Sequence, residues 1–265
     1  MEFQCPICGC ILNKEERSFR CENNHSFDVA RQGYVHLLPV QNKRSLNPGD
    51  TREQVLARRS FLEGGYYRPI SEALNKLAEG SEGPVLDAGC GEGYYSSRLG
   101  KALNAEVVGV DISKEAVRCA AASYKDATWL CASAARLPVA DGSVGLITSL
   151  FAFTDAEEFR RVLKPGGHFI RVLAAPDHLP ELKKLIYDTV LHKEKEGMTE
   201  LPGFTLQKTV PVRFSFTVTG QQVQNLLSMT PHVYRISKAG ADRLRQTEKL
   251  TDTASCILGL YQMDN

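Results

Sequence analysis

Four residues near the start of the chain have the types and spacing of a zinc site. Cys5 and Cys8 are separated by two residues. Cys21 is followed four positions later by His25. Three thiolates and one imidazole complete the tetrahedral coordination of Zn²⁺ and leave no open position, which is typical of a structural metal. Cys10 is an alternative ligand to Cys8, and free thiols that merely pack are the alternative to a metal.

Three alternating glycines follow a short apolar run further along the chain. Gly89, Gly91 and Gly93 come directly after residues 85–88, where a strand is expected to turn into a helix. Glycine lets the backbone bend sharply and lets a ligand approach main-chain atoms closely. The spacing is G-x-G-x-G, whereas a nicotinamide dinucleotide fingerprint reads G-x-G-x-x-G. The loop therefore favours a nucleotide-like cofactor of another kind.

Two acidic residues beside this loop narrow the choice of cofactor. Asp87 lies two residues before the first glycine, and Asp111 ends the next apolar run, 107–110. A carboxylate at the loop repels pyrophosphate but attracts the ammonium and sulfonium groups of S-adenosylmethionine. Asp111 has the position of an acid that accepts hydrogen bonds from ribose hydroxyls. The alternative is an ordinary strand-to-helix turn in which both acids cap helices.

Alternating apolar runs and helical segments predict a parallel sheet covered by helices on both faces. Two later strands are expected to pair antiparallel at the sheet edge. The seven expected strands are 85–88, 107–110, 128–131, 146–150, 169–173, 204–218 and 255–261. The expected helices outside the glycine-loop region are 52–62, 69–78, 179–191, 221–227 and 238–248. Asp50 or Thr51 is expected to cap the first of these helices, and with Thr51 as the cap Gln54 has the position of a capping-box partner.

The chain is expected to divide into a zinc module (1–40), a helical linker (41–80) and a cofactor-binding domain (81–265). Lys and Arg number 32 against 31 Asp and Glu, so any surface for nucleic acid must be local. The chain opens without the basic and apolar stretches of a secretory signal, and it holds no apolar run that could span a bilayer. We therefore expect a cytoplasmic protein with no membrane partner.

The glycine loop, its two acids and the later turn at 163–169 together resemble the class I methyltransferases. The resemblance covers about residues 84–174. It implies a Rossmann-like α/β fold with a seven-stranded mixed sheet, whose last hairpin is reversed, and S-adenosylmethionine as cofactor.

The whole chain resembles the bacterial 23S rRNA guanine-N1 methyltransferases. The stretches that carry this resemblance are 5–8, 33–41, 48–50, 57–62, 86–95, 164–167, 178–182 and 201–207. The family implies a guanine in the helix 35 hairpin of 23S rRNA as substrate, a zinc-ribbon-like module and a homodimer. It implies zinc on Cys5, Cys8, Cys21 and His25, and cofactor contacts from Tyr67, Gly91, Glu92 and His178. Tyr67 as a core aromatic and His178 as a helix N-terminal polar residue are the alternatives. The chain departs from the family pattern at 150–154, where a proline is expected.

The segment 31–68 is locally basic and supports an RNA partner. Its three acidic residues are Asp50, Glu53 and Glu63. We predict that this strip meets RNA phosphates, with an ordinary solvated face as the alternative. Its seven basic residues are Arg31, Lys43, Arg44, Arg52, Arg58, Arg59 and Arg68.

Transfer to guanine N1 requires removal of the N1 proton. Asp155 is the nearest carboxylate after the strand 146–150 and is a candidate acceptor, with helix capping as its alternative. Phe151, Phe153 and Tyr66 are candidates to stack on an exposed base.

The sequence is compatible with two other functions. One is a small-molecule methyltransferase, for instance one acting on a quinone, which has no need of the zinc module. The other is a non-enzymatic RNA-binding adaptor, which would not need intact cofactor residues.

Overall fold

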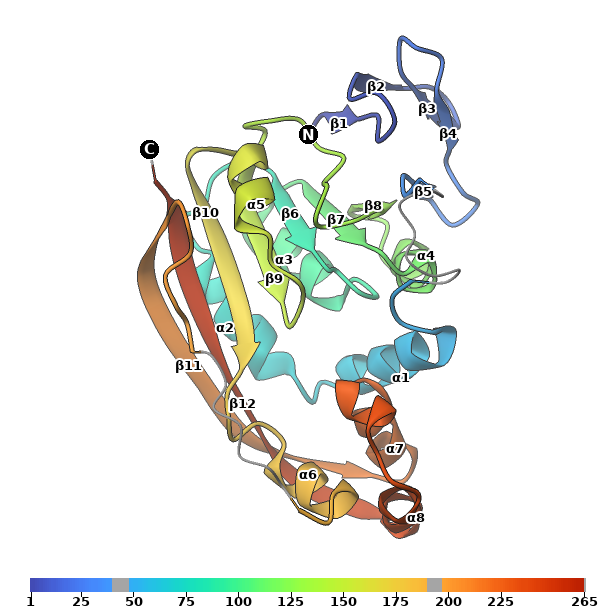
Figure 1. Ribbon diagram of the computed structural model, residues 1–265, viewed down its shortest axis with the longest axis vertical. Coiled ribbons are helices and arrows are strands. Elements are labelled where there is room, and N and C mark those ends of the chain that lie inside the picture. Colours follow the sequence, from blue (N-terminus) through green and yellow to red (C-terminus); the bar gives the residue numbers. More distant parts are fainter. Residues whose placement is uncertain (40–47, 190–196, 265) are drawn as a thin grey trace.

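The predicted strands form one mixed sheet (Figure 1). The computed structural model describes residues 1–39, 48–189 and 197–264. All seven predicted strands are present, and every residue of the two central ones, β6 and β9, is buried. The strands are β6 (Val85–Ala88), β7 (Val107–Asp111), β8 (Thr128–Cys131), β9 (Val144–Leu150), β10 (Leu163–Ala174), β11 (Phe204–Thr219) and β12 (Lys249–Met263).

The sheet order is β11-β12-β10-β9-β6-β7-β8-β5, so the last strand lies inside the sheet and reverses direction. β12 pairs antiparallel with both β10 and β11, as expected for the final hairpin. The eighth strand, β5 (Tyr34–His36), was not predicted and pairs in parallel with β8. β5 comes from the N-terminal segment, so the range predicted as a zinc module also supplies an edge of the large sheet.

A small second sheet precedes β5. It consists of β1 (Phe3–Gln4), β2 (Ile11–Lys14), β3 (Ser18–Arg20) and β4 (Ser26–Asp28). Strands of two to four residues bury little apolar surface, so this sheet depends on its surroundings. Phe3 and Phe19 are buried against each other at 5.6 Å between ring centroids, in the same cluster as Leu137 and Val139 of the large domain.

The helices follow the sequence prediction closely. α1 (Arg52–Glu63) begins with the predicted capping box between Thr51 and Gln54. The helix predicted over 179–191 is shorter: α6 (Pro180–Ile186) ends where Tyr187 turns to extended backbone, and residues 190 and 191 lie outside the described residues. The other helices are α2 (Arg68–Leu77), α3 (Tyr94–Leu103), α4 (Lys114–Ser123), α5 (Ala156–Val162), α7 (Gln221–Ser228), the 3₁₀ helix η2 (Pro231–Tyr234) and α8 (Lys238–Gln246).

The hairpin β11–β12 extends well past the rest of the sheet and carries α6, α7 and α8 at its far end (Figure 1). α7 returns toward the linker and packs beside α1, where Val223 and Leu226 join Phe61 and Leu62 in one buried cluster. This contact brings the segment after α7 over the carboxyl ends of the central strands.

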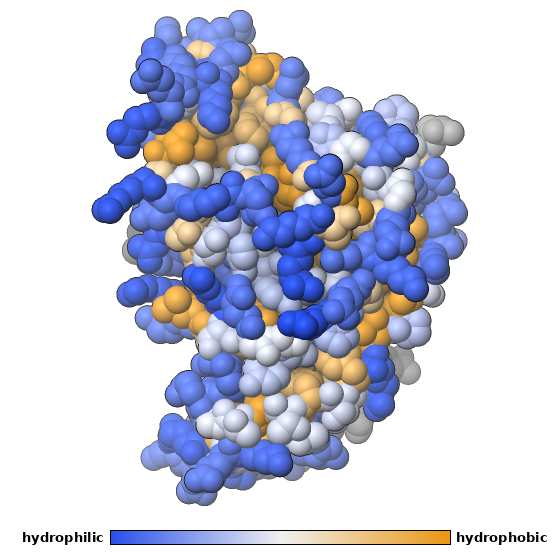
Figure 2. Space-filling view, turned by 180° about the vertical axis from the view of Figure 1, so that it is seen from behind, coloured by the Kyte–Doolittle hydropathy of each residue, from blue (hydrophilic) through white to orange (hydrophobic). Residues whose placement is uncertain are grey.

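Hydrophilic side chains cover most of the rear face, and apolar ones form separate patches (Figure 2). Among the described residues, no helix has the length and apolar character needed to cross a membrane.

Candidate active site

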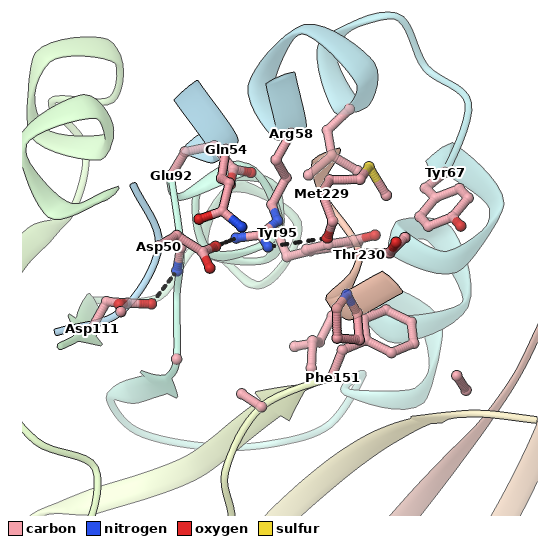
Figure 3. Close-up of a pocket in the computed structure, with 18 of the residues that line it drawn as sticks. Asp50, Gln54, Arg58, Tyr67, Glu92, Tyr95, Asp111, Phe151, Met229 and Thr230 are labelled. Carbon is pink, nitrogen blue, oxygen red and sulfur yellow. Dashed lines mark hydrogen bonds and ion pairs between the residues drawn. The ribbon is translucent and has the colours of Figure 1, made fainter. Parts of the chain in front are cut away.

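A cavity of about 830 Å³ opens at the carboxyl ends of β6, β7 and β9. Its walls come from the glycine loop, from α1, from the segment after β9 and from the segment after α7. Asp50, Glu92 and Arg58 lie close together on one side, and Phe151 lies below them (Figure 3). Ligands of parallel α/β sheets bind at this edge.

The glycine loop has the tight geometry that the sequence predicted. Gly89, Gly91 and Gly93 all have positive φ, at 89°, 56° and 88°. A Cβ added to Gly93 would lie 2.5 Å from the Trp129 ring, and one added to Gly89 would lie 2.4 Å from Ala152 Cβ. Both the backbone conformation and the lack of space therefore require glycine here.

The two predicted acids hold this loop in place. Asp87 is buried and accepts hydrogen bonds from Ser96 Oγ at 2.5 Å and Thr148 Oγ1 at 2.9 Å. Asp111 accepts from the backbone N–H groups of Gly91 at 2.9 Å and Ser113 at 2.8 Å. The alternative that these acids cap helices is wrong, because Gly93 and Ser113 are the N-caps of α3 and α4.

Burial raises the pKa of the acidic groups around the loop. Desolvation raises the pKa of Asp87 to about 6, although hydrogen bonds from Ser96 and Thr148 oppose this effect. Desolvation likewise raises the pKa of Glu92 to about 7, with the nearby Arg58 charge opposing it. The pKa of Asp111 is raised for the same reason. These carboxyls lack a sufficient positive partner, which a cationic ligand would supply.

We expect the affinity for S-adenosylmethionine to increase with pH because of these raised pKa values. At about pH 6 a large share of the Asp87 and Glu92 carboxyls is protonated, and at about pH 8 nearly all are ionised. A cation binds the ionised form, so affinity should rise by about tenfold over this range and binding should release protons. Calorimetric titrations in buffers of different ionisation enthalpy measure both quantities.

The matched variant for this prediction is Glu92→Gln, which should flatten most of the pH dependence. An affinity that stays constant with pH in the unmodified protein would show that the raised pKa values do not govern cofactor binding.

Tyr67 and His178, each proposed as a cofactor contact, meet in the cavity although 111 positions separate them. Tyr67 Oη lies 3.2 Å from His178 Nε2, and His178 Nδ1 lies against the Ser255 backbone. Both residues line the cavity, while the Tyr67 ring packs at 4.9 Å from Phe61. Tyr67 is thus a core aromatic whose hydroxyl belongs to the site, and its cofactor contact stays a proposal.

Phe151 has an unusual backbone for an aromatic residue. Its φ is +54°, a region that bulky side chains rarely adopt, and the residue is 41% exposed in the cavity wall. Its N–H donates to Val172 O at 3.0 Å, which fixes the turn directly after β9. Backbone strain of this kind is concentrated at functional sites. Phe153 is more exposed but does not line the cavity, and Tyr66 packs against Phe61 at 4.8 Å.

Asp155 lies away from the cavity lining. It is the N-cap of α5, and its carboxylate accepts a hydrogen bond from the Glu158 backbone N–H at 3.1 Å. The geometry therefore favours the capping role over proton transfer.

Arg58 lines the cavity, although the sequence analysis placed it among the RNA-binding residues of the basic strip. Its guanidinium pairs with Asp50 and donates to Met229 O at 3.3 Å. Gln54 is hydrogen-bonded at 2.8 Å to Tyr234 Oη, so α1 and the segment after α7 are joined at two points. No local pattern marks these pairs, because 171 and 180 positions separate the partners. Two further members of the strip, residues 43 and 44, lie outside the described residues.

Cys5, Cys8, Cys21 and His25 come together in the N-terminal module. Their ligand atoms lie within 4.8 Å of one another, and Cys5 Sγ is 3.5 Å from His25 Nδ1. Three sulfurs and one nitrogen at this separation fit a tetrahedral Zn²⁺. The alternative ligand Cys10 accepts a hydrogen bond from Asn23 at 3.3 Å and does not belong to this group.

Comparison with known proteins agrees with both parts of the fold. A family model described as "RlmA, N-terminal", a zinc ribbon, matches residues 3–46, and one described as "Methyltransferase domain" matches residues 85–167. The fold is similar to that of a solved structure whose title describes the conversion of a disulfide bond into a thioacetal group during echinomycin biosynthesis. The match covers 74% of this chain and 82% of that one. It has a TM-score of 0.51 and 17% identity, and it supports the fold alone.

Two relatives cover most of the chain. The 23S rRNA (guanine(748)-N1)-methyltransferase of Streptomyces fradiae is 38% identical, over 73% of this chain and 71% of its own length. The Bacillus subtilis protein YxjB, provisionally assigned as a 23S rRNA (guanine-N1)-methyltransferase, is 29% identical over 97% of this chain and 96% of its own length. The chain, a class I methyltransferase with a zinc ribbon at its N-terminus, therefore belongs to the 23S rRNA (guanine-N1)-methyltransferase family.

Proposed function

We propose that the protein transfers the methyl group of S-adenosylmethionine to N1 of a guanine in 23S rRNA. The observation that carries this proposal is the composition of the cavity. Four acidic residues in the glycine loop or beside it line the cavity, and their carboxylates suit a cationic methyl donor. They are Asp50, Asp87, Glu92 and Asp111. Phe151 and the cations Arg171, Lys183 and Arg235 also line it and suit a base with its phosphates.

The cofactor supplies an activated methyl group on a positively charged sulfur. The residues of the chain hold the partners: the glycine loop and Asp111 bind the nucleoside part, and the cavity excludes water from the transfer. Holding the guanine nitrogen, the methyl group and the sulfur in line should account for most of the rate. Phe151 is placed beside the loop, because its neighbour Ala152 packs against Gly89.

Replacing Phe151 by alanine is expected to lower kcat/KM for rRNA by about tenfold, since stacking on an aromatic ring stabilises a bound base by about 1–3 kcal/mol. The affinity for S-adenosylhomocysteine should stay nearly unchanged, because Phe151 belongs neither to the glycine loop nor to the carboxylates beside it, which are expected to hold the cofactor. Steady-state methylation and calorimetry measure the two effects.

Phe151→Tyr keeps the stacking surface and is the matched control, with near-normal kcat/KM expected. Equal losses in the alanine and tyrosine variants would show that the ring does not stack on the substrate.

We further propose that the target lies in the hairpin of helix 35, as the family resemblance implies. An rRNA substrate also agrees with the predicted cytoplasmic location and with phosphate contacts from Arg31, Arg52 and Arg68, which are exposed. A homodimer stays a prediction that light scattering can test.

The experiment is to incubate the protein and S-adenosylmethionine with unmodified 23S rRNA and to map the product by reverse transcription, which stops at N1-methylguanine. A single stop in the helix 35 loop is expected. A single stop at another guanine would overturn the helix 35 assignment, and the absence of any stop would overturn the proposed activity.

A further inference from the structure

We propose that the ring of Tyr234 is a stacking platform for the base next to the target guanine, and that the Arg235 guanidinium binds the phosphate of the same nucleotide. This inference rests on the RNA part of the proposed function and deepens it. Tyr234 is the last residue of η2 and Arg235 follows it, and both line the cavity at the wall formed by the segment after α7.

The ring of Tyr234 is exposed, whereas its hydroxyl is held by the protein. The residue is 71% exposed, compared with 60% for Phe153. Gln54 Nε2 donates to Tyr234 Oη at 2.8 Å, so the exposed surface belongs mainly to the ring. A surface tyrosine usually packs its ring against the protein and turns its hydroxyl to water. Tyr234 has the opposite arrangement, which leaves an apolar ring face for a ligand.

The position of this ring is fixed from two sides. Gln54 is 7% exposed, and its Oε1 accepts from the Thr51 N–H at 2.9 Å within the capping box of α1. The Arg235 N–H donates to His232 O at 2.9 Å, and His232 Nδ1 lies 2.9 Å from Tyr187 Oη, directly after α6. A ring held in this way loses little conformational freedom when a ligand stacks on it.

Arg235 places a positive charge beside the ring. It is exposed, and among the described residues its guanidinium forms no ion pair, unlike Arg58, which pairs with Asp50. Aromatic side chains stack on bases of any sequence, and cations next to them bind the phosphates. An exposed ring followed directly by an exposed cation therefore fits a nucleotide.

The place of Tyr234 in the cavity wall indicates which nucleotide it contacts. Phe151, which is proposed to stack on the target guanine, comes from the segment after β9. Met229 and Thr230, which lead into η2, lie above Phe151 in the view of Figure 3. A base that leaves the RNA stack to enter an active site deprives its neighbour of a stacking partner. The more exposed ring of Tyr234 can replace that partner.

The test combines changes in the protein with changes in a hairpin RNA that contains the target guanine. One RNA is intact, one has an abasic nucleotide on the 5′ side of the guanine, and one has it on the 3′ side. Tyr234→Ala should weaken binding of the intact RNA by about tenfold, measured by fluorescence anisotropy at fixed salt. The same loss is expected with one abasic RNA. With the other, which already lacks the stacked base, the loss should be within about twofold.

Two further variants separate the ring from the charge. Tyr234→Phe keeps the ring and should bind the intact RNA within about threefold of the unmodified protein. Arg235→Gln should weaken all three RNAs alike and lower the slope of log affinity against log salt by about one. Leu56→Ala is the matched control, because Leu56 is 48% exposed on α1 and does not line the cavity. It should bind every RNA normally.

Three results would overturn the proposal. They are normal binding of the intact RNA by Tyr234→Ala, an equal loss with all three RNAs in this variant, and an unchanged salt dependence in Arg235→Gln. The affinity of Tyr234→Ala for S-adenosylhomocysteine should be unchanged, and a tenfold loss would assign the ring to the cofactor instead.

The proposed function can survive the failure of this inference. Methylation of a single guanine by a protein whose RNA binding does not depend on Tyr234 would remove the platform alone. If the unmodified protein methylates no guanine in 23S rRNA, the proposed function and this inference both fail.

Discussion

Replacing Cys21 by serine is expected to reduce methylation of 23S rRNA by at least about a hundredfold, because binding of a structural zinc contributes about 10–16 kcal/mol to the folding of such modules. Cys21 is 3% exposed, and its sulfur lies 3.7 Å from Cys8 Sγ and 3.5 Å from His25 Nδ1. The strands around it are too short to hold the module without the metal. The affinity for S-adenosylhomocysteine should be nearly unchanged, since the cavity lies in the large domain.

A point substitution is preferable to deletion of the module here. Removing residues 1–39 would also remove β5 and uncover the edge of β8 in the cofactor-binding sheet. Zinc content by mass spectrometry and methylation of rRNA are the measurements. Cys119→Ser is the control, because Cys119 lies on α4 outside the metal cluster. This variant should keep both its zinc and its methylation activity. Full rRNA methylation by a zinc-free Cys21→Ser protein would contradict this prediction and would show that the metal is dispensable for recognition of the RNA.

Replacing Asp111 by alanine should lower the affinity for S-adenosylhomocysteine by at least about a hundredfold, because hydrogen bonds to a charged group contribute about 1.5–3 kcal/mol each. The substitution removes the acceptor for the ribose hydroxyls. It also removes the acceptor for the Gly91 and Ser113 N–H groups, so the glycine loop loses its anchor. Calorimetry gives the affinity, and thermal unfolding shows whether the fold survives.

Asp126→Ala is the matched control for this effect. Asp126 accepts from Ser97 and pairs with Lys101 at 3.3 Å, and it does not line the cavity. Its replacement should leave cofactor affinity unchanged. A similar affinity for Asp111→Ala and the unmodified protein would mean that the nucleoside binds elsewhere.

The strands in the centre of the large sheet were predictable from the sequence, because they are buried on both faces. β6 and β9 are mostly apolar and buried along their whole length, because parallel neighbours and helices cover both of their faces. β12 shows where such reasoning fails. Its predicted part, 255–261, nearly coincides with residues 256–262, which also pair with β10, whereas residues 249–255 pair with β11 only and are more polar. β5 was missed because three residues carry too little pattern.

Some residues of the site were likewise predictable from local sequence patterns, and others were not. Asp87, the glycines and Asp111 were found because one strand-loop-helix unit and the end of the next strand carry them. Arg58 was misread as a surface cation, since the charge of a side chain does not reveal its direction. Its partner Met229 reaches it only because the long hairpin returns α7 to α1. Contacts of this kind depend on tertiary packing and leave no local signature.

We propose above that this cavity methylates guanine N1 in 23S rRNA. The most direct measurement is nucleoside analysis by mass spectrometry, after the protein has acted on unmodified 23S rRNA with an isotopically labelled methyl donor. We expect the label in N1-methylguanosine, at one methyl group per RNA, and none when Asp111 is replaced by alanine. Label in any other nucleoside, or RNA that stays unlabelled while a small metabolite acquires the methyl group, would contradict the proposed guanine-N1 methylation.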